Sequence, residues 1–364
     1  MDVASVGGMR TLNLALQGGG SHGAFTWGVL DALLADGQVD FEGLSGTSAG
    51  ALNAVALASG WAAAEAAGRD PREGARERLA AVWNRVAAWG SLGALPQQFL
   101  RMLGGGVLSP YQSNPLGINP LRDLLEAEID FVAIAAHPRL KVFVSATHVN
   151  TGRAVVFSGR RLDARAVLAS ACLPLLFHAV EIDGEAYWDG GFSVNPALSP
   201  LLSECACADL LLVQINPLRR TDTPRTTAQI QDRIGELTFN ASLLTQMRAI
   251  DFINRLVAEG AVSHPRCRAV RVHRVDGGMA LEAYPGSSRA SADAVMIQRL
   301  CEAGRAAAHG WLGRHAAAIG QHGTVDIALD YLDDTRMELP RQAPPRRLLA
   351  PKFRPWLARL LRGS

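Results

Sequence analysis

Residues 11–50 read TLNLALQGGGSHGAFTWGVLDALLADGQVDFEGLSGTSAG, and this stretch decides the fold. Its first apolar run, residues 11–16, predicts a short β-strand. A glycine-rich loop follows at residues 18–23, and the apolar residues of 24–35 recur at the spacing of a helix. The first unit is therefore a strand, a loop and a helix.

A second unit of the same kind begins with a short strand over residues 41–45. That strand enters Gly46-Thr47-Ser48-Ala49-Gly50, and an alanine-rich helix continues to about residue 67. Two such units in succession predict a parallel sheet within one large α/β unit.

The second loop fits G-x-S-x-G, the nucleophile elbow, in which small flanking residues let the chain turn sharply and leave a serine hydroxyl exposed. A helix that starts at Ser48 also points backbone N–H groups at the site, which favours an oxyanion there. The same pattern can arise by chance in a chain rich in alanine and glycine. The strand before it and the helix after it favour a nucleophile.

The first loop, residues 18–23, offers backbone N–H groups without side-chain obstruction and can hold an anion. It also matches G-x-G-x-x-G, the dinucleotide fingerprint, which requires an acidic residue at the end of the next strand. Asp40 and Glu42 stand at the start of that strand, and Ser48 follows its end. A dinucleotide site is therefore disfavoured.

Asp189-Gly190-Gly191 places a carboxylate after two short predicted strands around residues 183–184. An Asp-Gly pair on its own is usually a turn. Its importance comes from the combination with Ser48, because a serine nucleophile needs a base.

The other predicted elements complete the α/β unit. They are helices over residues 70–89, 164–172, 227–259 and 287–318, strands over residues 140–147, 154–158, 210–215 and 268–273, and a glycine-, proline- and serine-rich connection over residues 90–119. Connections of that length are typical of lids and binding loops.

The glycine loop, G-x-S-x-G and D-G-G occur in the same order as in the patatin-like phospholipase family, and at comparable spacings. The chain therefore resembles this family. The resemblance implies a three-layer α/β/α fold with a mostly parallel central sheet. Residues 11–216 would be the catalytic core, with residues 233–250 similar to the helix that follows it in bacterial members. Residues 217–335 would be a helical and strand extension completing the same unit, and residues 336–364 a tail.

The resemblance further implies a serine lipid acyl hydrolase that cleaves carboxylic esters of phospholipids or related lipids, without cofactor or metal. Ser48 would be the nucleophile and Asp189 its base, with an acyl-enzyme as the intermediate. The backbone of Gly18, Gly19 and Gly20 would form the oxyanion hole. The glycines expected to support these motifs are Gly23, Gly46, Gly50, Gly190 and Gly191.

The family's loop often reads D-G-G-G-x-R-G, whereas this chain has Gln17 in place of the acid and His22 in place of the arginine. A cationic contribution to the oxyanion hole is therefore not implied. His148 and His178 could line the pocket, and a structural role away from it is an equal alternative for both.

Two other functions stay open. An ordinary α/β-hydrolase would order its triad as serine, acid and histidine. Candidate histidines after Asp189, none of them in a recognisable motif, are His264, His273, His309, His315 and His322. The second alternative is a catalytically weak protein that keeps the fold and binds lipid.

The composition argues against several other classes of protein. The chain has 364 residues, 48% hydrophobic, and its 36 basic and 34 acidic residues give a net charge of +2, which argues against nucleic acid as the main partner. Five irregularly spaced cysteines predict neither a disulfide framework nor a zinc site. Neither a secretory signal nor a membrane span is evident, so we expect a cytoplasmic protein.

The charge is unevenly distributed. Residues 339–364 carry seven basic groups and no acid, which leaves −5 on the rest of the chain. Arginines beside Phe353, Trp356 and several leucines are typical of a short interfacial helix, although two prolines limit its length. The tail therefore predicts peripheral contact with an anionic membrane; the alternative is a tail whose apolar residues pack on the domain.

Overall fold

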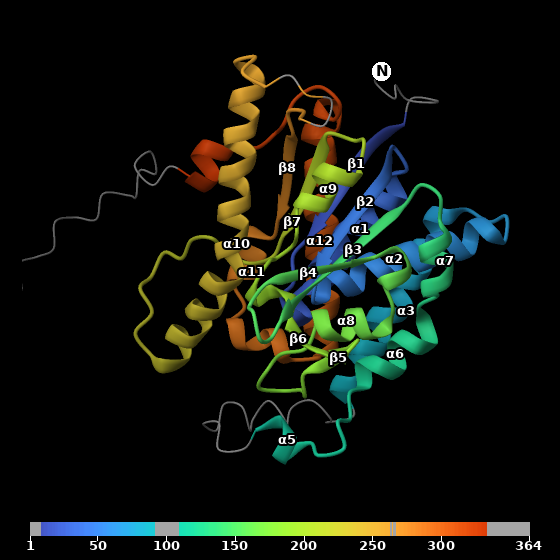
Figure 1. Ribbon diagram of the computed structural model, residues 1–364, viewed down its shortest axis with the longest axis vertical. Coiled ribbons are helices and arrows are strands. Elements are labelled where there is room, and N and C mark those ends of the chain that lie inside the picture. The colour runs from blue at the N-terminus through green and yellow to red at the C-terminus, as the bar shows by residue number, and fades with distance from the viewer. Residues whose placement is uncertain (1–8, 92–108, 263, 265–266, 333–364) are drawn as a thin grey trace, which may run out of the picture.

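The computed structural model describes residues 9–91, 109–262, 264 and 267–332 (Figure 1). At its centre lies an eight-stranded sheet in the order β5-β6-β3-β2-β1-β7-β8, with β4 also paired to β3. Its strands are β1 (Arg10–Leu16), β2 (Val39–Thr47), β3 (Lys141–His148), β4 (Ala154–Ser158), β5 (Val180–Ile182), β6 (Glu185–Asp189), β7 (Asp209–Gln214) and β8 (Arg271–Asp276).

Five neighbouring strands, β3, β2, β1, β7 and β8, run parallel. β3 pairs antiparallel with β4 and with β6, and β5 pairs antiparallel with β6. The predicted mostly parallel sheet is confirmed, with antiparallel pairing confined to one end.

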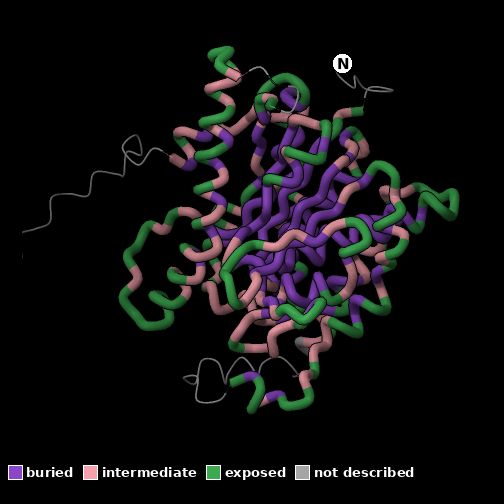
Figure 2. Tube along the Cα trace, in the orientation of Figure 1, coloured by how far each residue is buried: buried purple, intermediate pink, exposed green. Residues whose placement is uncertain are grey.

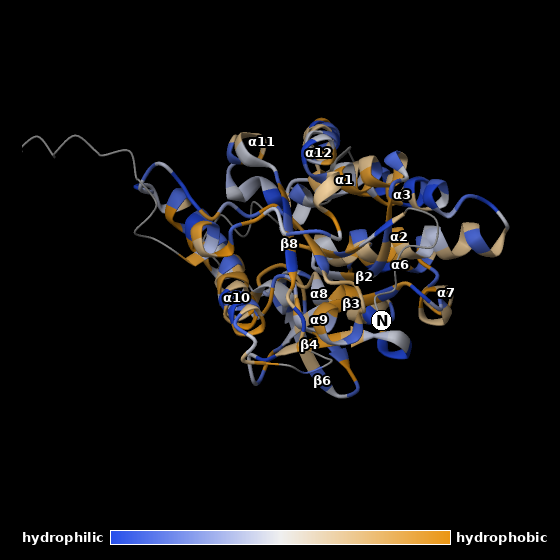
Figure 3. Ribbon diagram, turned by 90° about the horizontal axis from the view of Figure 1, so that it is seen from above, coloured by the Kyte–Doolittle hydropathy of each residue, from blue (hydrophilic) through white to orange (hydrophobic). Residues whose placement is uncertain are grey.

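Helices cover both faces of this sheet (Figure 3). One face carries α1 (Gly23–Asp36), α2 (Ala49–Ala66), α3 (Pro71–Ser91), α6 (Pro120–Glu128), α7 (Phe131–Ala136), α8 (Ala164–Ser170) and α12 (Ala294–His315). The other face carries α9 (Ser199–Glu204) and the long α10 (Thr227–Ala258). The shorter helices α5 (Pro110–Ser113) and α11 (Gly278–Glu282) lie at the periphery. The three-layer α/β/α fold is confirmed.

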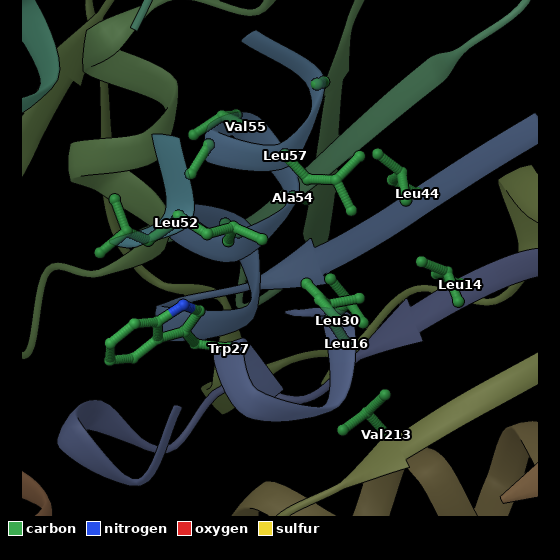
Figure 4. Close-up of a cluster of buried hydrophobic side chains, with 14 of the residues drawn as sticks. Leu14, Leu16, Trp27, Leu30, Leu44, Leu52, Ala54, Val55, Leu57 and Val213 are labelled. Atoms are coloured by element: carbon green, nitrogen blue, oxygen red, sulfur yellow. The ribbon is translucent and has the colours of Figure 1, made fainter. Parts of the chain in front are cut away.

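The sheet separates two hydrophobic cores, one on each face. Successive residues of a strand pack in different cores, because side chains alternate between the two faces of a strand. Leu14 and Leu16 of β1 pack in the core beneath α1 and α2, part of which Figure 4 shows, whereas Ala15 packs in the core beneath α9 and α10. β7 is buried at every position. This double burial explains its continuous apolar sequence, and the sheet forms the buried centre of the molecule (Figure 2).

Two sequence predictions need correction. The helix expected over residues 287–318 begins only at Ala294, because Asp293 caps it through a side-chain bond to the N–H of Met296, and a short 3₁₀ helix, η5 (Gly286–Ala290), precedes it. The strand expected over residues 268–273 is shifted to Arg271–Asp276, the segment that pairs with β7. Among the described residues no helix is both long and apolar enough to cross a membrane.

Candidate active site

Ser48 stands alone between β2, which ends at Thr47, and α2, which begins at Ala49. Its backbone has φ 56° and ψ −122°, a conformation in the positive-φ region that costs a residue with a Cβ energy and recurs at functional sites. The Ser48 N–H donates to the hydroxyl of Ser170 at 2.8 Å, which fixes the turn. The predicted elbow geometry is present.

The pairing of β3 explains why Asp189 lies next to this turn. β4 pairs with residues 143–147 of β3, so it occupies one edge of that strand. β2 pairs with residues up to Ser145 and β6 with residues from Ala146 onward, so both share the other edge. Thr47 is opposite Ser145, and Asp189 is opposite Ala146. The ends of β2 and β6 therefore meet, with Ser48 and Asp189 at the junction.

Asp189 is completely buried and forms no ion pair with any described residue. Oδ1 accepts the N–H of Gly191 at 2.7 Å, while Oδ2 has no hydrogen-bond partner within the described part of the chain. Burial raises the pKa of Asp189 to about 7, and the Gly191 N–H and the Ser48 hydroxyl partly oppose that rise. The serine hydroxyl is thus near enough to act on the carboxylate, although it lies outside direct bonding geometry, as is common in unliganded sites.

The glycine loop lies directly against the elbow. A Cβ on Gly18 would sit 2.7 Å from the Cβ of Ser48 and 2.6 Å from the carbonyl oxygen of Thr47, so only glycine permits this approach. Gly20 has φ +57° and opens the short helix η2 (Gly20–His22). The other motif glycines are equally close-packed, because a Cβ would lie within 2.6 Å of a neighbouring atom at each of Gly23, Gly46, Gly50, Gly190 and Gly191.

The expectation that Gly18 donates to an oxyanion is wrong. Its N–H already donates to Oδ1 of Asn195 at 2.6 Å, and its carbonyl accepts from Nδ2 of Asn216 at 2.7 Å. Gly19 and Gly20 differ, because the N–H groups at the start of a helix have no acceptor within the helix. The loop can therefore offer the N–H groups of Gly19 and Gly20 to an oxyanion.

Gln17 holds this loop in place from behind. Its buried Oε1 accepts the backbone N–H groups of Ile215 and Asn216, both at 3.0 Å. An amide at this position provides an acceptor for these groups without introducing a buried negative charge. Asn195 and Asn216 are not predicted from the sequence; each is followed by proline, a weak signal typical of turns.

His22 is neutral in this fold. Burial, together with the positive charge of Arg289, lowers the pKa of His22 to about 3. Its Nε2 lies 2.7 Å from the hydroxyl of Ser288. His22 therefore supplies no positive charge in place of the family's arginine.

Ser48 and Asp189 open into a cavity of about 490 Å³. Its walls are mainly apolar and come from α2, α3, the segment 171–177 and α10, and they include Leu52, Trp83, Trp89, Leu173, Leu176, Phe177, Phe192 and Phe239. Trp89 and Asn119 also line it, near the two ends of the predicted lid, of which residues 92–108 lie outside the described residues. A cavity of this size and character suits an acyl chain.

The candidate histidines do not line this cavity. His178 stacks on Tyr111 at 4.2 Å, and His148 bonds to Glu185, so of the two alternatives left open for them the structural role fits and the lining role does not. Among the histidines after Asp189, His273 is buried against Asp209, at 3.0 Å. The described residues thus bring together Ser48, Asp189 and the glycine loop, and no described histidine lines the cavity into which they open.

The acidic residues considered for a dinucleotide lie at the opposite end of β2. Glu42 accepts the N–H groups of Ala206 and Cys207, and Asp40 is 4.0 Å from Arg72. Across the described ranges no cluster of three or more histidine, cysteine or acidic side chains is placed to hold a metal.

Comparisons with known proteins identify the family of the chain. A family model described as Patatin-like phospholipase matches residues 14–202, a range that contains the glycine loop, the elbow and Asp189. Among solved structures, the crystal structure of VipD from Legionella pneumophila is similar, with 13% sequence identity, a TM-score of 0.33, and coverage of 81% of this chain and 67% of that chain. A comparison with curated proteins gives no match.

Proposed function

The chain belongs to the patatin-like phospholipase family, a family of lipid acyl hydrolases, and from this premise we propose that it hydrolyses lipid esters with Ser48 and Asp189 as a catalytic dyad. The observation that carries the proposal is the meeting of β2 and β6 on one edge of β3, which juxtaposes the serine and a buried, otherwise unpaired carboxylate oxygen. Release of fatty acid from a phospholipid and from a short neutral ester by the purified protein tests it.

In the proposed mechanism Asp189 takes the proton of the Ser48 hydroxyl as Oγ attacks the ester carbonyl. The N–H groups of Gly19 and Gly20 stabilise the tetrahedral oxyanion. When the intermediate collapses, the carbon–oxygen bond of the ester breaks, and Asp189 returns the proton to the departing alcohol. Water, deprotonated by the same carboxylate, then releases the fatty acid and restores Ser48.

The raised pKa of Asp189 predicts the pH dependence of hydrolysis. Only the carboxylate can accept the serine proton, so kcat/KM on a short neutral ester should rise about tenfold per pH unit up to about pH 7 and then level off. A series of initial rates between about pH 5 and 9 measures this. A flat profile, or a rate that falls as the pH rises through about 7, contradicts Asp189 as the base.

A dyad is preferred to a serine–acid–histidine triad because no described histidine lines the cavity. The other alternative is a catalytically weak protein that binds lipid. Covalent labelling distinguishes it from an enzyme, because the label attaches only to an activated serine.

We also propose that the basic tail, residues 336–364, brings the enzyme to anionic membranes; these residues lie outside the described range. Removing residues 339–364 takes away seven positive charges, so binding to vesicles that contain phosphatidylglycerol should weaken by at least about tenfold at low salt. Co-sedimentation with such vesicles measures the effect. Unchanged binding would rule out the tail as the membrane contact.

A further inference from the structure

Arg289 lines the same cavity as Ser48 and Asp189. It belongs to η5 and lies against the glycine loop, where its carbonyl oxygen would be 2.1 Å from a Cβ on Gly20. Gln231, Asp232 and Ser287 line the cavity beside it, so one end of an otherwise apolar cavity is polar.

The guanidinium of Arg289 makes fewer hydrogen bonds than those of Arg220 and Arg233, the two arginines that also lie beside the carboxylate of Glu236. Arg220 donates twice to Glu236, and Arg233 donates once to Glu236 and also to backbone carbonyls. Arg289 is 3.7 Å from Oε1 of Glu236, makes no hydrogen bond through its side chain to any described residue, and has a buried Nε without a partner. Both oxygens of Glu236 are already occupied by the other two arginines.

The remaining acid at this end of the cavity does not pair with it. Arg289 is close enough to Asp232 to oppose the burial-driven rise of the Asp232 pKa, but no ion pair within 4.0 Å joins the two side chains in the described part of the molecule. Glu236 is thus shared by three guanidinium groups, and Arg289 is the one among them that makes no hydrogen bond to it in the described part of the chain. An unsatisfied buried charge is costly unless a ligand completes its hydrogen bonds.

We propose that Arg289 binds an anionic group, a phosphate or a carboxylate, carried by the alcohol portion of the substrate. The inference rests on the proposed function of the Ser48 site and names its substrate class: acyl esters with a negative charge near the scissile bond. The planar guanidinium matches both oxyanions through paired N–H donors, and its partly dehydrated position strengthens the interaction. The apolar walls then receive the acyl chain.

Three short esters with the same acyl chain, whose alcohol portions are neutral or carry a phosphate or a carboxylate, test the proposal. They are 1-octanoylglycerol, 1-octanoylglycerol 3-phosphate and 3-octanoylglycerate, used below their aggregation limits, with octanoate release as the readout. Arg289→Gln should lower the ratio of kcat/KM for the anionic over the neutral ester by about 10- to 100-fold, the range expected for hydrogen bonds to a charged group. Arg289→Lys, which retains charge but not the fork of donors, should give an intermediate ratio.

Arg219→Gln is the matched control, because Arg219 is exposed and does not line this cavity, and it should leave the ratio unchanged. A loss confined to the phosphate ester supports a phosphate site, and a loss on both anionic esters supports a general anion site. A ratio unchanged within about twofold in both Arg289 variants overturns the inference while wild-type hydrolysis stands. Octanoate release that persists in Ser48→Ala instead overturns the proposed function itself.

Discussion

Replacing Ser48 by alanine should abolish ester hydrolysis, with kcat lowered by roughly 10⁴- to 10⁶-fold, because the Ser48 hydroxyl both lines the cavity and interacts with Asp189. The loss should come from chemistry and not from unfolding. Alanine has the same Cβ as serine, so the positive φ at this position costs about as much in the variant as in the wild type. Fatty-acid release and circular dichroism, measured on the same preparations, check both statements.

Ser45→Ala is the matched control for this variant. Ser45 is a buried serine of β2, the strand that leads to Ser48, and its hydroxyl donates to the carbonyl of Ala197 instead of facing the cavity. It should lose about 1 kcal/mol of stability and keep its hydrolytic rate. Activity above about one per cent of wild type in folded Ser48→Ala contradicts the nucleophile assignment.

Replacing Asp189 by asparagine should lower kcat by roughly 10³- to 10⁴-fold and at the same time stabilise the protein at alkaline pH. The amide cannot accept a proton, but its oxygen can still accept the N–H of Gly191. Burial raises the pKa of Asp189 in the folded state above its unfolded value, so the folded protein binds more protons between about pH 4 and 7. Wild-type stability therefore falls as the pH rises through that window, and the variant loses this dependence.

Asp209→Asn should change the stability of the protein in the opposite direction. Burial would raise the pKa of Asp209, but hydrogen bonds from His273 and Arg271 outweigh it and lower that pKa to about 2. Its ionised form stabilises the fold at neutral pH, so this variant should be less stable than wild type and remain active. Urea denaturation at about pH 5 and about pH 8 distinguishes the two variants. An Asp189→Asn variant that retains substantial hydrolysis contradicts the dyad.

The sequence predicts the parts of the site that are encoded locally. Ser48 is recognisable because the elbow is contiguous and lies between a strand and a helix. The roles of Gly18 and Arg289 depend on contacts between distant segments. Gly18 donates to Asn195, 177 positions away in the chain, so no local pattern reveals that its N–H is already used. Arg289 reaches the cavity only because η5 packs on the glycine loop.

The elements of the fold also divide into those that the local sequence predicts and those that depend on contacts between distant segments. Strands with continuous apolar sequences, such as β7, are predicted closely because burial on both faces leaves a clear pattern. The start of α12 is misplaced because the alternative start at residue 287 also resembles a helix, and the cap at Asp293 decides between them. The shared edge of β3, which unites Ser48 with Asp189, is a property of strand pairing and has no sequence signature.

Covalent labelling of the intact protein tests the central claim, an activated Ser48, most directly. A fluorophosphonate should attach once, with the adduct found by peptide mass spectrometry on Ser48, and the label should be absent from Ser48→Ala and strongly slowed in Asp189→Asn. A well-folded wild-type protein that takes up no label, or that is labelled at another residue, would contradict the account.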